Sequence, residues 1–332
     1  MIKIGKTNLG SFPLLLAPME GVTDPSFRAI CKEHGADMVY TEFVSVEGLI
    51  RNVKKSQKKI SIFPHERPVG IQIYGANLES MLKAAKVVEA AQPEVLDINY
   101  GCPVSKVVNK MCGAGILQDV DRMVSLTRAV VEATSLPVTV KTRLGWNAET
   151  IRIGEVVERL QEVGIQAITI HARTRKQMYK GEADWDWFLR IKENPNITIP
   201  VFGNGDINSP EKAQAYRAQY RVDGMMIGRA AIGRPWIFSQ IKHYMATGDL
   251  LPEPGMEERI KIIHQHLNHS LEWKGDKVGI LEMRRHYTNY FKSIPHFKPF
   301  RLRLLTEMNP QIVREILDEI GYTFARTYEQ IN

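Results

Sequence analysis

The chain has few cysteines and lacks long apolar runs. Its three cysteines, Cys31, Cys102 and Cys112, cannot all pair, and none belongs to two matched CxxC motifs. This count disfavours both a disulfide framework and a zinc site. No stretch reaches the roughly 18 to 20 apolar residues of a membrane span, and the N-terminus lacks the apolar stretch of a signal peptide. We therefore expect a reduced, cytoplasmic protein that works as a monomer, without a metal or a membrane partner.

Acidic residues are fewer than basic ones, 37 against 44, which gives a net charge of +7. The excess favours polyanionic partners such as nucleic acid. Apolar residues at 44% and charged residues at 24% exclude a disordered or fibrous chain. A length of 332 residues fits one α/β barrel with an extension, or two ordinary domains.

Eight short runs rich in Val, Ile and Leu recur along the first three-quarters of the chain. They occupy residues 14–17, 38–40, 69–73, 95–99, 138–141, 167–171, 201–204 and 224–228. Such near-continuous hydrophobicity is typical of parallel strands that are buried on both faces. Segments with helical spacing lie between them, at residues 24–34, 78–91, 121–134, 150–163 and 210–219.

This alternation predicts an α/β fold, a (β/α)8 TIM barrel. A doubly wound sheet is the alternative, but it would place a GxGxxG loop after its first strand, where residues 17–21 read APMEG. The alternation stops near Gly248, and residues 251–255 are rich in proline and glycine. We therefore predict a barrel over residues 1–248, a linker over 249–255 and a small all-helical C-terminal domain over 256–332.

Polar residues follow six of the predicted strands, where barrel enzymes place their chemistry. Together with the glycines beside them, they are Gln72, Asn99, Cys102, Lys141, Arg143, His171, Arg173, Asn204, Gly205, Asp206, Gly228 and Arg229. Such residues at six successive strand ends indicate one polar pocket. The small-residue turns at 203–206 and 228–231 suggest a phosphate site that Arg229 could pair with. Two tight turns without a ligand are the alternative.

Two further residues point to chemistry in this pocket. Lys141 leaves a buried strand and so needs an anionic or acceptor partner, such as a reduced flavin ring. Cys102 lies in a strand-end loop between Gly101 and Pro103. An isolated cysteine is more often inert, but this position and its polar neighbours favour catalysis. We expect Cys31 and Cys112 to be inert.

Five motifs resemble those of the tRNA-dihydrouridine synthase family, and most closely its bacterial B-type members. They are APMEGVTD at 17–24, DINYGCP at 97–103, KTRLG at 141–145, HART at 171–174 and GNGDI at 203–207. The motifs occur in the family's order, and the resemblance covers nearly the whole chain. It implies an FMN-binding barrel followed by a helical RNA-binding domain.

The resemblance implies FMN-dependent reduction of specific uridines in tRNA to 5,6-dihydrouridine, with NADPH as the electron source. It implies a hydride from reduced flavin to C6 and a proton from Cys102 to C5. The implied flavin contacts are Pro18, Met19, Glu20, Gln72, Lys141 and His171. The implied ribityl and phosphate contacts are Asn204, Gly205, Asp206, Gly228 and Arg229. The implied substrate contacts are Asn99, Arg143 and Arg173.

A basic segment near the C-terminus predicts the tRNA contacts. Between residues 284 and 303 there are six basic residues and no acidic one: Arg284, Arg285, Lys292, Lys298, Arg301 and Arg303. We expect Arg284, Arg285, Arg301 and Arg303 to contact phosphates. The interleaved aromatics either stack on bases or form the core of the helical domain. A second cluster, Arg51, Lys54, Lys55, Lys58 and Lys59, ranks below this one.

Two other functions compete with tRNA reduction. A flavin barrel could act on a free small molecule, as dihydroorotate-type dehydrogenases do, but the basic helical domain would then have no role. An RNA-binding protein with a vestigial flavin would leave Cys102 unexplained.

Overall fold

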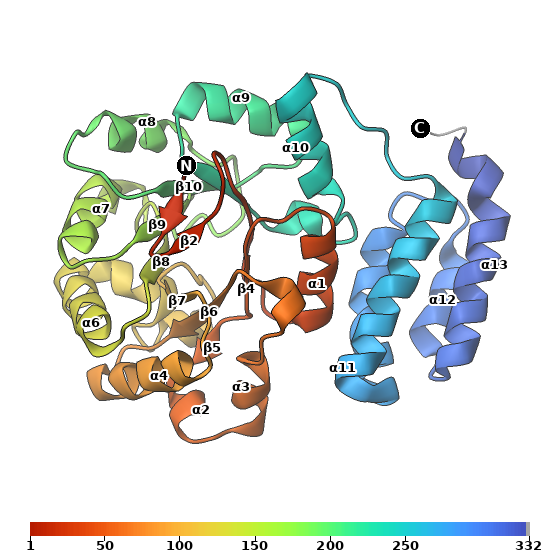
Figure 1. The fold of residues 1–332 in the computed structure, drawn as a ribbon, viewed down its shortest axis with the longest axis horizontal. Coiled ribbons are helices and arrows are strands. Elements are labelled where there is room, and N and C mark those ends of the chain that lie inside the picture. Colours follow the sequence, from red (N-terminus) through yellow and green to blue (C-terminus); the bar gives the residue numbers. More distant parts are fainter. Residues whose placement is uncertain (330–332) are drawn as a thin grey trace.

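A computed structural model describes residues 1–329 and shows a barrel beside a helical region (Figure 1). The barrel strands are β3 (Leu14–Leu16), β4 (Val39–Tyr40), β6 (Val69–Tyr74), β7 (Val95–Asn99), β8 (Val138–Arg143), β9 (Ala167–His171), β10 (Val201–Asn204) and β11 (Gly224–Ile227). Neighbouring strands are parallel, and β11 pairs with β3. The Leu16 N–H donates to the Met38 carbonyl at 2.9 Å, which closes the ring. The predicted (β/α)8 barrel is confirmed.

The barrel interior is packed rather than open. Leu15, Tyr40 and Phe202 belong to one buried cluster inside the ring. Leu14 and Leu16, the chain neighbours of Leu15, pack outward in another cluster. This alternation is the strand period of two. The same inner cluster includes residues of the N-terminal hairpin, formed by β1 (Lys3–Ile4) and β2 (Thr7–Asn8), which are antiparallel. The hairpin therefore closes the N-terminal end of the barrel.

Helices surround the strands (Figure 1). They are α1 (Pro25–Glu33), α2 (Val46–Ile50), α3 (Lys54–Lys59), α4 (Leu78–Ala90), α5 (Ser105–Val108), α6 (Val120–Ala133), α7 (Ile153–Glu162), α8 (Asp186–Glu193), α9 (Pro210–Tyr220) and α10 (Ile237–Thr247). A short strand, β5 (Val44–Ser45), also pairs with β6. The carboxylate of Asp24 caps α1 by accepting the Phe27 N–H at 3.0 Å. All five predicted helices are present within three residues of their predicted ends, whereas α2, α3, α5, α8 and α10 were not predicted.

The C-terminal region is helical, as predicted. Its elements are α11 (Met256–Tyr290), α12 (Lys298–Thr306) and α13 (Pro310–Glu329). Element α11 is a hairpin rather than one rod, because Gly275 has a left-handed φ of 74°. The two arms run side by side, since Arg259 Nη1 donates to the Tyr290 carbonyl at 2.8 Å. Residues 249–255 form neither helix nor strand.

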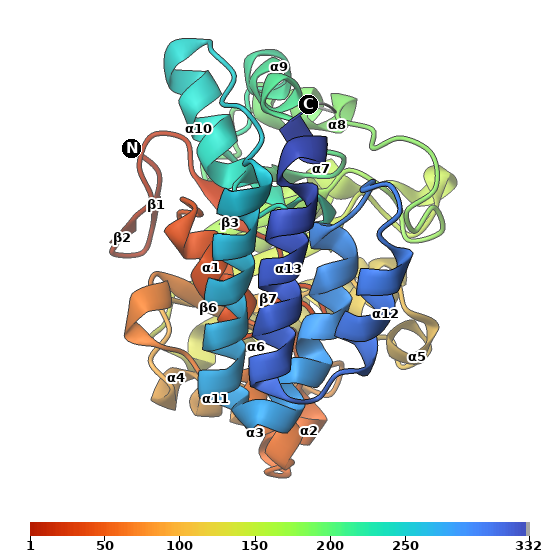
Figure 2. The same ribbon diagram turned by 90° about the vertical axis from the view of Figure 1, so that its right-hand side faces the viewer.

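The helical region packs against α1 of the barrel (Figure 2). Ile30 of α1 joins the core of the helical region, and Phe27 stacks on His286 with ring centroids 5.1 Å apart. This contact fixes α11 beside the loop that joins β3 to α1. Across residues 1–329, no helix combines the length and the apolar character needed to cross a bilayer.

Candidate active site

A cavity of about 830 Å³ opens at the carboxyl ends of the barrel strands. Thirteen of the predicted site residues line it: Pro18, Met19, Glu20, Asn99, Cys102, Lys141, Arg143, His171, Asn204, Gly205, Asp206, Gly228 and Arg229. Residues from the first strand loop and from the last two strands meet here because a closed barrel brings all strand ends to one rim. The sequence therefore predicted a set of residues that the fold does bring together.

Lys141 reaches the cavity from β8. Its Nζ donates to Asn204 Oδ1 at 3.2 Å, and Asn204 Nδ2 in turn donates to the Met226 carbonyl at 2.7 Å. Burial lowers the pKa of Lys141 to about 8, with the nearby Arg143 cation acting in the same direction. The lysine is therefore a cation at neutral pH. Among residues 1–329 its hydrogen bond goes to the Asn204 amide, while the nearby Asp97 carboxylate favours its charge. An anionic or electron-rich ligand would stabilise it further.

His171, at the end of β9, faces the same cations. Burial lowers the pKa of its imidazole well below the ordinary value, and Arg143 and Lys141 lower it further. The ring is therefore neutral at physiological pH and can accept or donate one hydrogen bond from the cavity wall.

A buried polar ladder lies beneath the cavity. Gln72 Nε2 donates to Asp97 Oδ2 at 2.6 Å, and Asn99 Nδ2 donates to Gln72 Oε1 at 2.7 Å. Thr139 Oγ1 donates to the other carboxylate oxygen of Asp97. Burial raises the pKa of Asp97 to about 6. Gln72 is fully buried and does not line the cavity, so here it orients Asn99. Direct contact with a flavin, as predicted, would require a rearrangement.

The loop that carries Cys102 is held from both sides. Asn99 Oδ1 accepts the N–H groups of Gly101 and Cys102 at 3.0 and 2.9 Å. Arg143 Nε donates to the Gly101 carbonyl at 2.7 Å. Burial raises the pKa of the Cys102 thiol, so the group keeps its proton at neutral pH. The arrangement presents a protonated thiol at the cavity wall.

Arg143 also anchors the loop that follows β9. Its Nη1 donates to the carbonyls of Thr174 and Met178, at 3.1 and 2.9 Å. The guanidinium lies 5.6 Å from the centre of the Tyr179 ring. Burial lowers the pKa of Arg143 to about 10, which leaves it charged at neutral pH. Arg143 therefore holds the Cys102 loop and the Tyr179 loop together at the cavity rim.

Arg173 is buried beside the cavity rather than on it. Its Nη1 and Nη2 form a bidentate pair with Asp206, at 2.9 and 2.6 Å. Burial would raise the pKa of Asp206, but the hydrogen bond from Arg173 brings it below the ordinary value. Arg229 reaches the same carboxylate at 3.2 Å, while its side chain is 57% exposed. Arg173 therefore positions Asp206 and Arg229, and its predicted substrate contact has no open path in this arrangement.

The helical region bonds directly to the cavity loop at residues 18–24. Arg285 of α11 donates to the Gly21 carbonyl, and Lys274 at the turn of α11 pairs with Asp24. Burial alone would raise the pKa of Asp24, but Lys274 and the nearby imidazoles hold it well below its ordinary value. A loop that contributes Pro18, Met19 and Glu20 to the cavity is thus fixed by α11.

Gly228 leaves room at the rim. A Cβ added there would lie 3.4 Å from Ala17 Cβ and 3.6 Å from Met19 Sδ. All three residues line the cavity, so a side chain at position 228 would occupy part of its mouth. An open glycine turn beside Arg229, in a cavity that Lys141 also lines, fits a phosphorylated, electron-rich ligand.

The basic C-terminal segment is only partly free for a partner. Arg285 bonds to Gly21, Arg303 pairs with Glu319 at 2.8 Å, and Arg284 Nη2 lies 3.4 Å from the Glu307 carbonyl. Arg301 is exposed. Four of the interleaved aromatics are buried in the helical core: Tyr287, Tyr290, Phe291 and Phe297. These four aromatics therefore form part of the helical core and are not free to stack on bases.

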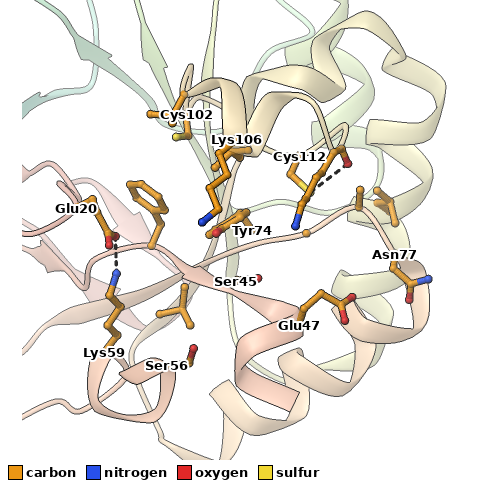
Figure 3. A pocket seen from close by; sticks show the side chains of 18 of the residues that line it. Glu20, Ser45, Glu47, Ser56, Lys59, Tyr74, Asn77, Cys102, Lys106 and Cys112 are labelled. Atoms are coloured by element: carbon orange, nitrogen blue, oxygen red, sulfur yellow. Dashed lines mark hydrogen bonds and ion pairs between the residues drawn. The ribbon is translucent and has the colours of Figure 1, made fainter. Parts of the chain in front are cut away.

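A second cavity has a volume of about 940 Å³, and Figure 3 shows side chains that line it. Both cavities are lined by Glu20, Phe43, Cys102 and Val104. Sequence reasoning missed Phe43 and Tyr74 here, as well as Tyr179 in the first cavity. Single aromatics outside strand ends carry no pattern in one sequence. Asp97 did carry a signal, because an acidic residue inside an apolar strand needs partners.

Comparisons of the sequence with known proteins point to one family. The family model described as dihydrouridine synthase matches residues 15–321. The chain is 41% identical over 302 residues to tRNA-dihydrouridine synthase B of Pseudomonas putida, covering 91% of this chain and 89% of that one. It is 37% identical over 328 residues to a probable tRNA-dihydrouridine synthase of Rickettsia conorii, covering 98% of both chains.

Solved structures show the fold alone. Histamine dehydrogenase from Rhizobium superposes with a TM-score of 0.52 at 14% identity, over 79% of this chain and 50% of that one. A morphinone reductase variant in complex with tetrahydroNAD superposes with a TM-score of 0.50 at 10% identity, over 72% and 90%. The family match over nearly the whole chain and the identity to full-length relatives show that this chain belongs to the dihydrouridine synthase family.

Proposed function

We propose that this chain reduces specific uridines in tRNA to 5,6-dihydrouridine, with bound FMN and with NADPH as the reductant. The observation that carries the proposal is the protonated Cys102 thiol on a barrel-mouth cavity that also holds Lys141 and Arg229. Relatives that are 35–41% identical over most of their length carry the name tRNA-dihydrouridine synthase.

The residues present fit FMN. The Gly228 turn and the exposed Arg229 guanidinium would hold the phosphate, and Asn204 and Gly205 would line the ribityl chain. Lys141, a cation with one amide partner, would meet the polar edge of the ring system. When bound, FMN supplies the hydride that C6 of uracil accepts.

Cys102 would supply the proton that completes the reduction. Hydride addition at C6 leaves negative charge along C5 and the C4 carbonyl of uracil, so C5 must gain a proton. The raised pKa of the Cys102 thiol keeps that proton available at neutral pH. Asn99 fixes the Cys102 backbone at 2.9 Å, which holds the donor in place. Water would then reprotonate the thiolate.

The substrate would be a base flipped out of folded tRNA. A base inside a stack cannot reach a barrel mouth, and flipping it costs a few kcal/mol unless a loop already exposes it. The helical region lies beside the mouth and carries exposed cations such as Lys298 and Arg301, which would contact phosphates.

The test is a reaction with purified protein loaded with FMN. Unmodified tRNA, free uridine and orotate are each supplied with NADPH, and the reduced pyrimidine is quantified. We expect dihydrouridine in tRNA alone. Reduction of free uridine or orotate with no product in tRNA would instead favour a small-molecule dehydrogenase. Absence of any reduction by flavin-loaded protein would contradict both functions.

A further inference from the structure

The second cavity has no occupant in the reaction described so far. It lies between the α2–α3 segment, the turn after β6 and the segment from Cys102 to Cys112 (Figure 3). Phe43 and Cys102 line both cavities, so the two cavities lie side by side at the thiol. A molecule whose reacting part meets Cys102 therefore lies next to the second cavity.

The floor of this cavity is apolar and aromatic. The rings of Phe43 and Tyr74 meet edge to face at 73°, with centroids 5.6 Å apart. Leu78 and Val104 also line it and are 49% and 50% exposed. Apolar side chains gathered at an exposed site commonly mark a binding surface. Aromatic faces beside cations are the surface on which single-stranded bases stack.

The rim of the cavity is cationic. Within the described part of the chain, three exposed lysines of the rim make no ion pair: Lys55, Lys106 and Lys110. Of the two carboxylates that line the cavity, Glu20 pairs with Lys59 at 2.5 Å and Glu47 with Arg51 at 3.5 Å. The positive charge of the three lysines is therefore uncompensated and suits a phosphodiester.

We propose that this second cavity, the flanking-nucleotide groove, holds the nucleotide next to the uridine that is reduced. The inference rests on the proposed reduction of tRNA. The neighbouring nucleotide stays covalently attached when the target base flips out, so it must lie close to the first cavity, and the second cavity shares Phe43 and Cys102 with it. Its base stacks against Tyr74 and Phe43, and its phosphates contact Lys106 and Lys110.

The first test removes two rim charges, with a matched control. The double variant Lys106→Ala/Lys110→Ala is compared with Lys83→Ala/Lys86→Ala on α4, where both lysines are exposed and pair with Glu79 and Glu89. Holoenzyme kcat/KM for tRNA is measured at several salt concentrations. We expect a fall on the order of tenfold for the groove variant only. Its slope of log kcat/KM against log salt should weaken by about 0.7 per lost contact.

The second test removes the stacking ring while keeping apolar bulk. Tyr74→Leu should lower kcat/KM for tRNA roughly 5- to 100-fold, which is the range for loss of one base–aromatic stack. The KM for NADPH in flavin reduction should stay at the parent value, because the reductant is not the occupant.

Three outcomes are decisive. A groove variant that matches the Lys83/Lys86 control, while the parent reduces tRNA, would overturn the inference and leave the proposed function standing. A raised KM for NADPH with unchanged tRNA kinetics would make the reductant the occupant and would also overturn it. A flavin-loaded parent that does not reduce tRNA would instead overturn the proposed function.

Discussion

At the residue scale, burial has opposite effects on the two central groups of the cavity. It raises the pKa of the Cys102 thiol and lowers that of Lys141 to about 8. Below pH 8 the thiol is protonated and the lysine is charged, so a proton donor and a cation coexist. As the pH rises through 8, Lys141 loses its charge before the Cys102 thiol loses its proton. We therefore expect the affinity for any anionic ligand that contacts Lys141 to fall.

Arg229 tests the phosphate end of the cavity. Arg229→Ala should weaken FMN binding about 10- to 100-fold, because one charge-assisted contact contributes roughly 1.5 to 3 kcal/mol. The matched control is Arg152→Ala, since Arg152 is 56% exposed against 57% for Arg229 and also pairs with a carboxylate. Flavin dissociation is followed by fluorescence. Equal dissociation constants for the two variants would move the phosphate site elsewhere.

Strand-end positions could be read from the sequence, but the direction of each side chain could not. Gln72 and Arg173 follow the pattern of the other polar residues, yet neither lines the barrel-mouth cavity. Gln72 lies within β6, two residues before its end, and bonds to Asp97. Arg173 lies behind the cavity lining, where its guanidinium forms the bidentate pair with Asp206. Partners that are distant in sequence decide both orientations.

At the element scale, α11 fixes the loop at residues 18–24. Arg285→Met removes the hydrogen bond to the Gly21 carbonyl, so this loop should loosen and FMN should dissociate faster. Arg301→Met removes an exposed arginine from the same helical region and should leave flavin dissociation at the parent rate. The same two variants are then compared for tRNA affinity against salt.

We expect the opposite ranking in that second measurement. Arg301→Met should reduce the salt slope by about 0.7 to 0.9, whereas Arg285→Met should change it less. Identical behaviour of the two variants in both measurements would contradict separate roles for the two arginines.

The eight strands were predictable because both of their faces are buried, which leaves continuous apolar runs. Helix α8 was missed because it is only eight residues long and is preceded by a long loop. The reversal at Gly275 was also missed, since a single glycine inside a helical pattern does not reveal a hairpin. Only packing of the two arms, as in the contact of Arg259 with Tyr290, makes the turn visible.

At the scale of the whole molecule, buried histidines join the barrel to the helical region. Burial lowers the pKa of His286 to about 4 and holds that of His266 well below its ordinary value. Between pH 6.5 and 4 the unfolded chain therefore binds protons that the folded chain does not. The free energy of unfolding should fall as the pH falls through this window, by about 3 kcal/mol for His286.

His286→Phe keeps a ring against Phe27 and removes one of these proton sites. Urea unfolding between pH 7 and 4 should then show a shallower loss of stability than in the parent. The control is His264→Gln, because His264 pairs with Asp318 of α13 and its replacement leaves both buried imidazoles in place. This variant should lose stability with falling pH as steeply as the parent. A parent-like pH dependence for His286→Phe would contradict this account of the interface.

The most direct measurement compares two thiols of similar burial in one segment. Cys102 and Cys112 are 7% and 8% exposed, but only Cys102 lines the barrel-mouth cavity. Dihydrouridine formed in tRNA per flavin-loaded enzyme is measured for Cys102→Ala and Cys112→Ala. We expect Cys102→Ala to retain FMN and to lose about a hundred- to ten-thousand-fold in turnover. Cys112→Ala removes one thiol from the lining of the second cavity and none from the barrel-mouth cavity, so we expect it to keep far more turnover than Cys102→Ala. Near-parent turnover by Cys102→Ala with its flavin bound would contradict the account.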